Sequence, residues 1–168
     1  MEAGTKRNFT LQQGLQEPSP ELCPVQYSAL QFQPRVVGVV LLVGVALQSA
    51  AVFLALSALL WWSVLLHRWN PFDAVYNRTF GAQPGAVSLK SAPAPRRFAQ
   101  GMAGTFALAI GVSLLLGWRA AAYVVEAVFV AAVAALVFSG FCLGSFMFHL
   151  LRGRAAFAKK TLPWVRDV

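Results

Sequence analysis

The sequence of 168 residues is poor in charge, and above all in acidic residues. Only 12% of its residues are Asp, Glu, Lys or Arg, against about 25% in a typical soluble domain. Six acidic residues stand against 14 basic ones, and the 31 residues from Val36 to Leu66 carry no ionisable side chain. With 58% hydrophobic residues, the composition excludes an ordinary soluble enzyme and predicts a membrane protein with no room for a separate catalytic domain.

Cysteine is also scarce, and recognisable catalytic patterns are missing. Cys23 and Cys142 are too few for a disulfide framework, and no Cys/His set has the spacing of a zinc site. The sequence contains no glycine-rich phosphate loop, no Ser/His/Asp set and no carboxylate pair. We therefore predict no catalytic residues and no metal site. The basic residues border apolar segments, which accounts for the excess of positive charge without nucleic acid as a partner.

Three regions are expected along the chain. Residues 1–35 are polar and contain four prolines. They lack the short apolar core of a signal peptide, so we expect them to stay in the cytoplasm and to lie along a partner. Residues 36–151 form the transmembrane domain, in which residues 67–97 are a connection at the membrane surface. Residues 152–168 form a basic tail that should contact anionic lipid or an acidic partner.

The apolar blocks favour four transmembrane helices. As one helix, Val36 to Leu66 would be about 46 Å long, against a hydrocarbon core of roughly 30 Å, so we expect it to fold back near Gln48-Ser49. The second block divides into Phe98 to Leu116 and Ala120 to Leu151 around Arg119. Because Lys and Arg collect on the cytoplasmic side, four helices place every basic residue except Arg119 on one side. The predicted fold class is therefore all-α, an integral membrane bundle of four helices in two hairpins with both termini cytoplasmic. Three spans are the alternative.

The connection 67–97 begins with aromatic residues among polar ones. Its first half contains Trp69, Phe72, Tyr76 and Phe80. Aromatics at the depth of the lipid headgroups, with charges facing water, are typical of a helix that lies on the membrane surface. We expect a short interfacial helix here.

Small residues at four-residue spacing mark the last expected helix. They are Ala127, Ala131, Ala135 and Ser139, followed by the step from Gly140 to Gly144. Such spacing lets helix backbones approach closely, which is a principal cause of helix association in lipid. The stripe is expected to pack inside this chain, with packing against a second protein as the alternative.

Two motifs resemble a bacterial integral-membrane family that has no assigned function. They are Pro95-Arg96-Arg97-Phe98-Ala99-Gln100 and Gly140-Phe141-Cys142-Leu143-Gly144, with a looser Asn70-Pro71-Phe72 after the first hairpin. The resemblance implies a four-helix protein. Ser145 stands where the family pattern has a second cysteine, so a Cys-x-x-Cys thiol role is not carried over. The layout is also similar to that of DoxX-like membrane proteins, some of which serve quinone-linked redox complexes. This second likeness is an analogy of layout.

Glu126 is the one acidic residue inside an expected span. Acidic residues within membranes are costly and usually functional. The carboxyl could bind a proton, contact a partner subunit or line a substrate path. Equally, it could form a structural pair with Arg119 or with Gln48 across the hairpins.

Cys142, Ser145 and His149 lie at spacings that place them on one face of a helix. A thiol beside a histidine could act as a nucleophile or as a pair of soft metal ligands, but a buried free cysteine more often behaves as a small hydrophobic residue. His67 and His149 end the second and fourth helices on the same side, and a pair of this kind could ligate haem. We expect neither role, and no cofactor.

These observations predict an accessory or scaffold subunit of a larger membrane complex of respiratory or photosynthetic type, without catalysis of its own. Its partners would be the bilayer and other membrane-protein subunits. The composition, with ten Arg against four Lys, is typical of a bacterial gene of high GC content, so the expected location is the bacterial inner membrane. The alternatives are a redox or sulfur-handling protein that uses a thiol and a small transporter centred on Glu126.

Overall fold

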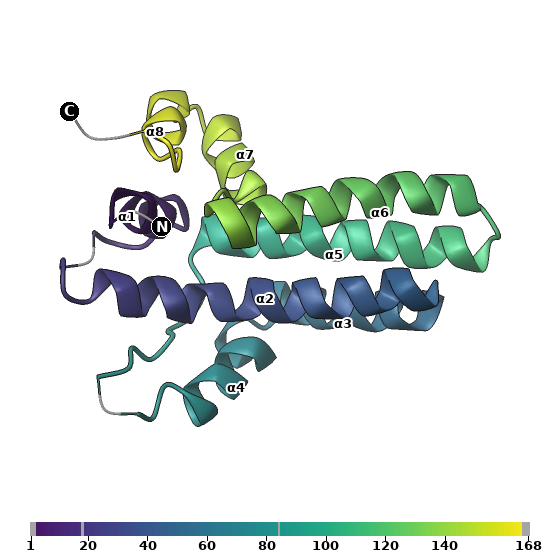
Figure 1. Ribbon diagram of the computed structural model, residues 1–168, viewed down its shortest axis with the longest axis horizontal. Coiled ribbons are helices and arrows are strands. Elements are labelled where there is room, and N and C mark those ends of the chain that lie inside the picture. The colour runs from purple at the N-terminus through teal and green to yellow at the C-terminus, as the bar shows by residue number, and fades with distance from the viewer. Residues whose placement is uncertain (1–2, 18, 84, 166–168) are drawn as a thin grey trace.

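The computed structural model describes residues 3–17, 19–83 and 85–165, and every regular element in these ranges is helical. Figure 1 shows long helices lying along one axis, with short helices gathered toward one end. The elements are α1 (Ala3–Gln12), α2 (Cys23–Leu47), α3 (Ala50–Leu65), η1 (His67–Trp69), α4 (Pro71–Thr79), α5 (Ala94–Leu115), α6 (Arg119–Ala134), η2 (Ala135–Ser139), α7 (Leu143–Leu151) and α8 (Ala155–Lys160). The prediction of an all-α chain is confirmed.

The first apolar block folds back where predicted. α2 ends at Gln48, whose backbone is left-handed with φ of 46° and whose N–H donates to the carbonyl oxygens of Gly44 and Val45. Ser49 caps α3, because its hydroxyl accepts from the Val52 N–H at 3.5 Å. A left-handed conformation costs a non-glycine residue about 1–2 kcal/mol. This turn is therefore stabilised by hydrogen bonds and packing, since the local conformational preference of Gln48 opposes it.

α2 begins at Cys23, well before the predicted start at Val36. Pro24 occupies the first turn of the helix, where a missing N–H costs little. The polar stretch that follows is helical because α1 packs on it. There the rings of Phe9 and Tyr27 meet edge to face with centroids 5.2 Å apart. Much of the expected N-terminal region is thus part of the first long helix.

The core is formed by α2, α3, α5 and α6 together with Phe72 of α4. Its buried members are Val37, Leu41, Phe53, Leu56, Leu60, Phe72, Ala107, Ile110 and Phe129. Glycines on α5 let α3 approach closely: a Cβ on Gly111 would lie 2.9 Å from the Leu54 side chain, and one on Gly104 would lie 3.0 Å from that of Trp61. Close backbone approach of this kind stabilises helix pairs where no hydrophobic driving force acts between them.

The last expected helix is broken, which corrects the prediction of one helix from Ala120 to Leu151. α6 passes into the π-helical turn η2, and the turn ends at Gly140, whose φ is 69°. Glycine adopts this left-handed conformation without strain and commonly ends helices. The chain then enters α7 in a new direction (Figure 1). Gly140 and Gly144 therefore do not form a step along one helix.

Within the described residues, three helices are long and apolar enough to cross a membrane, namely α2, α5 and α6 with η2. α3 has 16 residues, or about 24 Å, and the segment His67–Thr79 bends away from it by 117°. Counting these two as one broken span raises the number to four. The predicted four is therefore the upper figure by length and composition.

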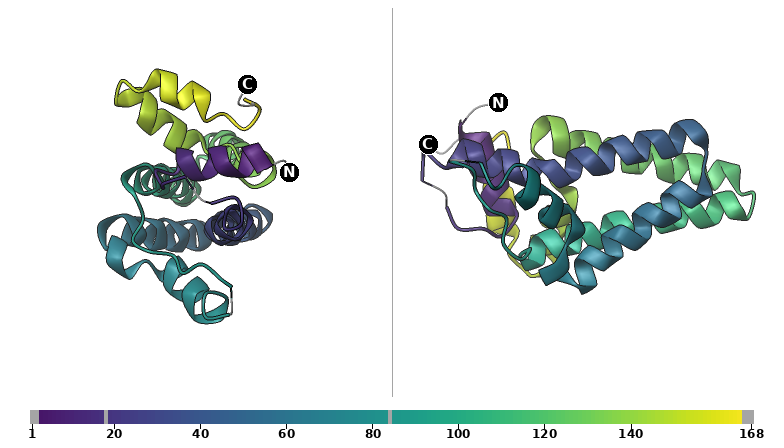
Figure 2. Two further views of the ribbon diagram at one scale, coloured as in Figure 1. Left: turned by 90° about the vertical axis from the view of Figure 1, so that its left-hand side faces the viewer. Right: turned by 90° about the horizontal axis from the view of Figure 1, so that it is seen from below.

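The two ends of the bundle differ in character. α1, α4, α7 and α8 lie toward one end, which we call the polar end, whereas the α2–α3 and α5–α6 turns lie at the other, the turn end (Figures 1 and 2). Asn8 Nδ2 on α1 donates to the carbonyl oxygens of Leu162 and Val165, both at 3.0 Å, and Thr5 Oγ1 donates to that of Pro163 at 3.0 Å. The first helix is thus tied to the segment that follows α8.

Candidate functional site

A buried ion pair joins α4 to α5 at the polar end. Arg96 Nη2 lies 2.6 Å from Asp73 Oδ1, and Arg96 Nη1 lies 3.4 Å from Asp73 Oδ2. The two residues are 5% and 6% exposed. Removing two charges from water costs several kcal/mol for each ion, and their attraction offsets this only when other polar atoms are bonded as well. The pair therefore requires further partners.

Amide side chains supply these partners. Gln33 Oε1 on α2 accepts from Arg96 Nη2 at 3.1 Å and from Gln100 Nε2 at 2.8 Å. Asn70 Nδ2, at the start of α4, donates to Asp73 Oδ2 at 3.0 Å. We call the following residues the buried polar network: Gln33, Ser63, Asn70, Asp73, Arg96 and Gln100. It connects α2, α3, α4 and α5.

The start of α4 explains how Asp73 enters the network. Asn70 caps the helix, since its Oδ1 accepts from the Phe72 N–H at 3.0 Å and from Ser63 Oγ at 3.1 Å. An Asn-Pro pair is a recognisable helix start in a sequence, but it does not tell which face is buried. The expectation that the charges of this segment face water is wrong for Asp73. By contrast, the neighbouring Trp69 is 78% exposed.

The segments that carry the family resemblance lie together. Asn70–Phe72 and Pro95–Gln100 contribute to the buried polar network. The third segment packs beside them, because a Cβ on Gly144 would lie only 2.6 Å from the Ala99 Cα. Ser145 Oγ donates to the Pro95 carbonyl oxygen at 3.4 Å. One end of the bundle therefore holds all three motifs.

Cys142, Ser145 and His149 are all buried at the polar end, although Cys142 precedes α7 as its cap residue. The Cys142 N–H donates to Gln12 Oε1 at 3.0 Å. His149 Nε2 donates to the Gln12 carbonyl oxygen at 3.1 Å. Gln12 of α1 therefore contacts both Cys142 and His149.

A small cavity of about 80 Å³ is lined by Cys142 and by Gln33, Arg96 and Gln100 of the buried polar network. Gln100 Oε1 is buried and has no hydrogen-bond partner among the described residues. At roughly 30 Å³ per molecule, such a space holds about two to three waters. Phe9 of α1 forms part of its wall. The thiol therefore lines a mostly apolar space that has a few polar side chains in its wall and that α1 partly covers.

The two histidines considered for haem ligation have different surroundings. His149 is 3% exposed, with its Nε2 engaged by Gln12 and its ring edge-on to that of Phe157, with centroids 4.8 Å apart. His67 in η1 is half-buried, and its Nδ1 has no partner in the described part of the chain. Ligation by both would require the His149–Gln12 contact to break. In residues 3–17, 19–83 and 85–165, no group of three or more His, Cys, Asp or Glu side chains could hold a metal ion.

Glu126 is buried near the turn end, where its carboxylate accepts hydrogen bonds from Gln48. Gln48 Nε2 lies 3.2 Å and 3.1 Å from the two carboxylate oxygens and also donates to the Val45 carbonyl oxygen at 2.9 Å. Arg119 is exposed, and no ion pair links it to Glu126 within the described residues. Of the two structural pairs considered, the structure forms the one between the hairpins.

The stripe of small residues on α6 faces outward. Ala127, Ala131 and Ser139 are exposed and Ala135 is half-buried. The buried face of α6 is a different one, where Phe129 stacks on Phe106 of α5 with centroids 5.7 Å apart. The expectation that the stripe packs inside this chain is therefore corrected.

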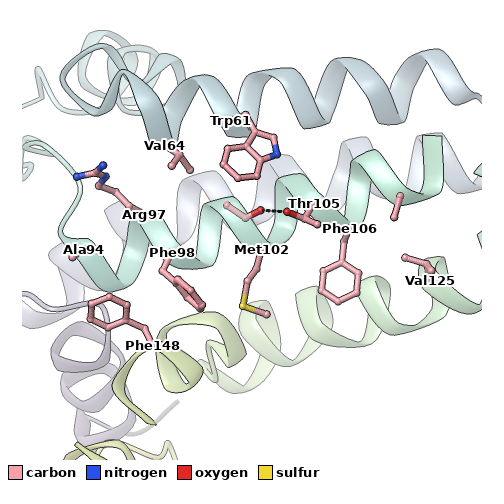
Figure 3. A pocket seen from close by; sticks show the side chains of 12 residues that line it. Trp61, Val64, Ala94, Arg97, Phe98, Met102, Thr105, Phe106, Val125 and Phe148 are labelled. Carbon is pink, nitrogen blue, oxygen red and sulfur yellow. Dashed lines mark hydrogen bonds between the residues drawn. The ribbon is translucent and has the colours of Figure 1, made fainter. Parts of the chain in front are cut away.

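An apolar groove of about 710 Å³ runs along the outer face of α5. Figure 3 shows α5 in the middle, with side chains of α3 on one side of it and side chains of α6 and α7 on the other. The principal lining residues are Trp61, Val64, Phe98, Met102, Phe106 and Phe148, and Arg97 lies near the polar end of the row (Figure 3).

Comparison with known proteins identifies a family but no activity. The model of a family described as a domain of unknown function (DUF4395) matches residues 25–153. The chain therefore belongs to this family, and the expected membership of a family without assigned function is confirmed. No curated protein and no solved structure matches the chain. The likeness in layout to DoxX-like proteins stays a prediction.

Proposed function

We propose that this member of the DUF4395 family is a bacterial inner-membrane protein of four helices in two hairpins, and that it serves as an accessory or scaffold subunit of a larger membrane complex. Large apolar side chains on every long helix point outward, for example Val39, Leu65, Leu115 and Val124. A continuous apolar surface of this kind indicates contact with lipid or with another protein.

The charge distribution supports a cytoplasmic polar end. The basic residues of α1, of the segment from α3 to α5 and of α7 and α8 belong to the polar end, whereas Arg119 begins α6 at the turn end. This is the asymmetry expected when short loops rich in Lys and Arg remain in the cytoplasm. α4, bent away from α3, would then lie along the inner membrane surface.

The outward-facing stripe of small residues on α6 is the main observation in favour of the accessory role. Ala127 and Ala131 are exposed on a helix whose most apolar window is only 17% buried inside the chain. Small side chains on the open face of a span let a partner helix approach closely, and this is a principal source of helix association in lipid. A second membrane protein would gain a close packing surface there.

The test is co-purification in mild detergent followed by mass spectrometry. We expect the wild-type chain to retain membrane-protein partners and Ala131→Phe to lose them, because the ring blocks close approach. Val43→Phe on α2 is the matched control, since Val43 is also exposed and apolar but lies away from the stripe. A wild-type chain that runs as a lone monomer would refute the accessory role.

A second candidate function is thiol chemistry at Cys142. Cys142 shares a cavity with Arg96 and with Gln100 Oε1, which has no hydrogen-bond partner among the described residues. This cavity supports thiol chemistry, because a small reagent could reach the sulfur there. If the thiol reacts, Cys142→Ala should abolish the thiol-dependent activity and leave co-purification with partner membrane proteins unchanged. If Cys142→Ala preserves both, the thiol serves packing.

A further inference from the structure

The groove along α5 combines an apolar floor with a cation at one end. Gly101 lies beneath the α3 side chains, since a Cβ there would meet Val64 at 3.8 Å and Trp61 at 3.9 Å. The missing side chain leaves the space open. From Ala94 to Ala109 the lining residues of α5 cover about 22 Å of helix rise, which is more than one leaflet of a core roughly 30 Å thick.

The two arginines of the Pro-Arg-Arg segment have different partners. Arg96 points inward and is neutralised by Asp73. Arg97 lines the groove instead, its Nε is unpartnered, and its side chain makes no ion pair or hydrogen bond with the described residues. A second cation lies close by, because the Arg152 guanidinium sits over the ring of Phe148, 4.9 Å from its centroid, and Phe148 also lines the groove.

We propose that this groove is a binding site for one anionic phospholipid, with an acyl chain lying against Trp61, Gly101 and Phe106 and the phosphate held by Arg97. A planar guanidinium forms paired hydrogen bonds with phosphate oxygens. Basic pockets between helices on the cytoplasmic side are typical sites for acidic lipid headgroups. The volume of about 710 Å³ lies in the range of roughly 300–1,000 Å³ that ligand sites occupy.

Charge, and not apolar area, gives this site its selectivity. Lipid tails are as apolar as the groove, so burying a chain distinguishes poorly between lipids. One basic residue near the surface contributes about 1 kcal/mol toward an anionic lipid, or about a fivefold preference. The inference rests on the proposed membrane location and is independent of the accessory role, because the groove and the α6 stripe are different surfaces.

The test uses native mass spectrometry of the purified, delipidated full chain with equal amounts of phosphatidylglycerol and phosphatidylcholine. We expect the first bound lipid to be phosphatidylglycerol by about fivefold. Arg97→Gln should remove this preference and Gly101→Leu should reduce binding of both lipids, because the new side chain fills the groove. Arg68→Gln is the matched control, since Arg68 is an exposed arginine of η1 that does not line the groove.

Three results would overturn the proposal. The first is a wild-type chain without preference between the two lipids. The second is an equal loss in Arg68→Gln and Arg97→Gln, which would indicate a diffuse positive surface. The third is displacement by glycerol phosphate at the same concentration, which would show that no acyl chain is held. If Gly101→Leu fails to fold, Arg97→Gln still tests the proposal. A wild-type chain that retains no membrane-protein partner in the co-purification experiment would refute the accessory role and leave these lipid-binding results unchanged.

Discussion

Removal of the Asp73 carboxylate tests whether the buried polar network holds the polar end together. In Asp73→Ala, Arg96 keeps Gln33 Oε1 as an acceptor at 3.1 Å but loses the contacts at 2.6 Å and 3.4 Å. Breaking a buried ion pair from one side costs about 3–5 kcal/mol, because an uncompensated charge stays buried. Since Arg96 keeps one acceptor, we expect a loss of about 3 kcal/mol in the free energy of unfolding, at the lower end of that range.

Two controls distinguish this loss from a general effect of charge removal. Arg7 and Glu17 form an ion pair whose side chains are 33% and 57% exposed, so Glu17→Gln should cost no more than about 1 kcal/mol. The double variant Asp73→Leu/Arg96→Met removes both charges, and stability should return close to the wild-type value. The assay is unfolding of the detergent-solubilised chain by titration with sodium dodecyl sulfate, followed by tryptophan fluorescence. An Asp73→Ala loss no greater than that of Glu17→Gln would refute the reasoning.

Three further predictions concern single positions. At the α2–α3 turn, Gln48→Gly should be more stable than Gln48→Ala by about 1 kcal/mol in the same titration, because both lose the amide but only glycine relieves the left-handed strain. Gly144→Ala should lower the free energy of unfolding by about 1–3 kcal/mol, because its Cβ would lie 2.6 Å from the α5 backbone. The control Gly101→Ala should be nearly neutral, because a Cβ there meets side chains only at 3.8 Å and 3.9 Å. Equal effects of the two variants would contradict this. In a Cys23→Ser background, Gln12→Ala should raise the rate at which Cys142 is alkylated, because it removes the acceptor of the Cys142 N–H. An unchanged rate would contradict the conclusion that α1 covers Cys142.

The fold-back of the first apolar block was predicted correctly from its length. A block too long for one span had to fold back, and the polar pair Gln48-Ser49 marked the place even though neither residue is a glycine. A short helix after the first hairpin was expected from its spaced aromatics, and α4 occupies that position. Its location at the membrane surface stays a prediction. These predictions succeeded because the length and polarity of a segment act locally.

The parts that depend on distant contacts were missed. Arg96 and Asp73 are 23 residues apart, and no local pattern says that a charge beside aromatics turns inward. The helical start at Cys23 depends on packing against α1, which the polarity of both segments concealed. The break at Gly140 depends on a positive φ. From the sequence alone, a glycine that ends a helix looks the same as a glycine within a helix that allows close packing.

The two buried groups of polar side chains described above lie at opposite ends of the bundle, and the apolar core lies between them. At the polar end the network joins α2 and α4 to α5, and at the turn end Gln48 joins the first hairpin to Glu126 of the second. Between them, small and apolar residues allow close approach, but apolar surfaces in lipid discriminate weakly between one alignment of helices and another. Directional hydrogen bonds at two separated points fix both the rotation and the longitudinal position of the hairpins. We infer that the buried polar groups specify one arrangement, while the outward apolar faces stay available for lipid and partner proteins.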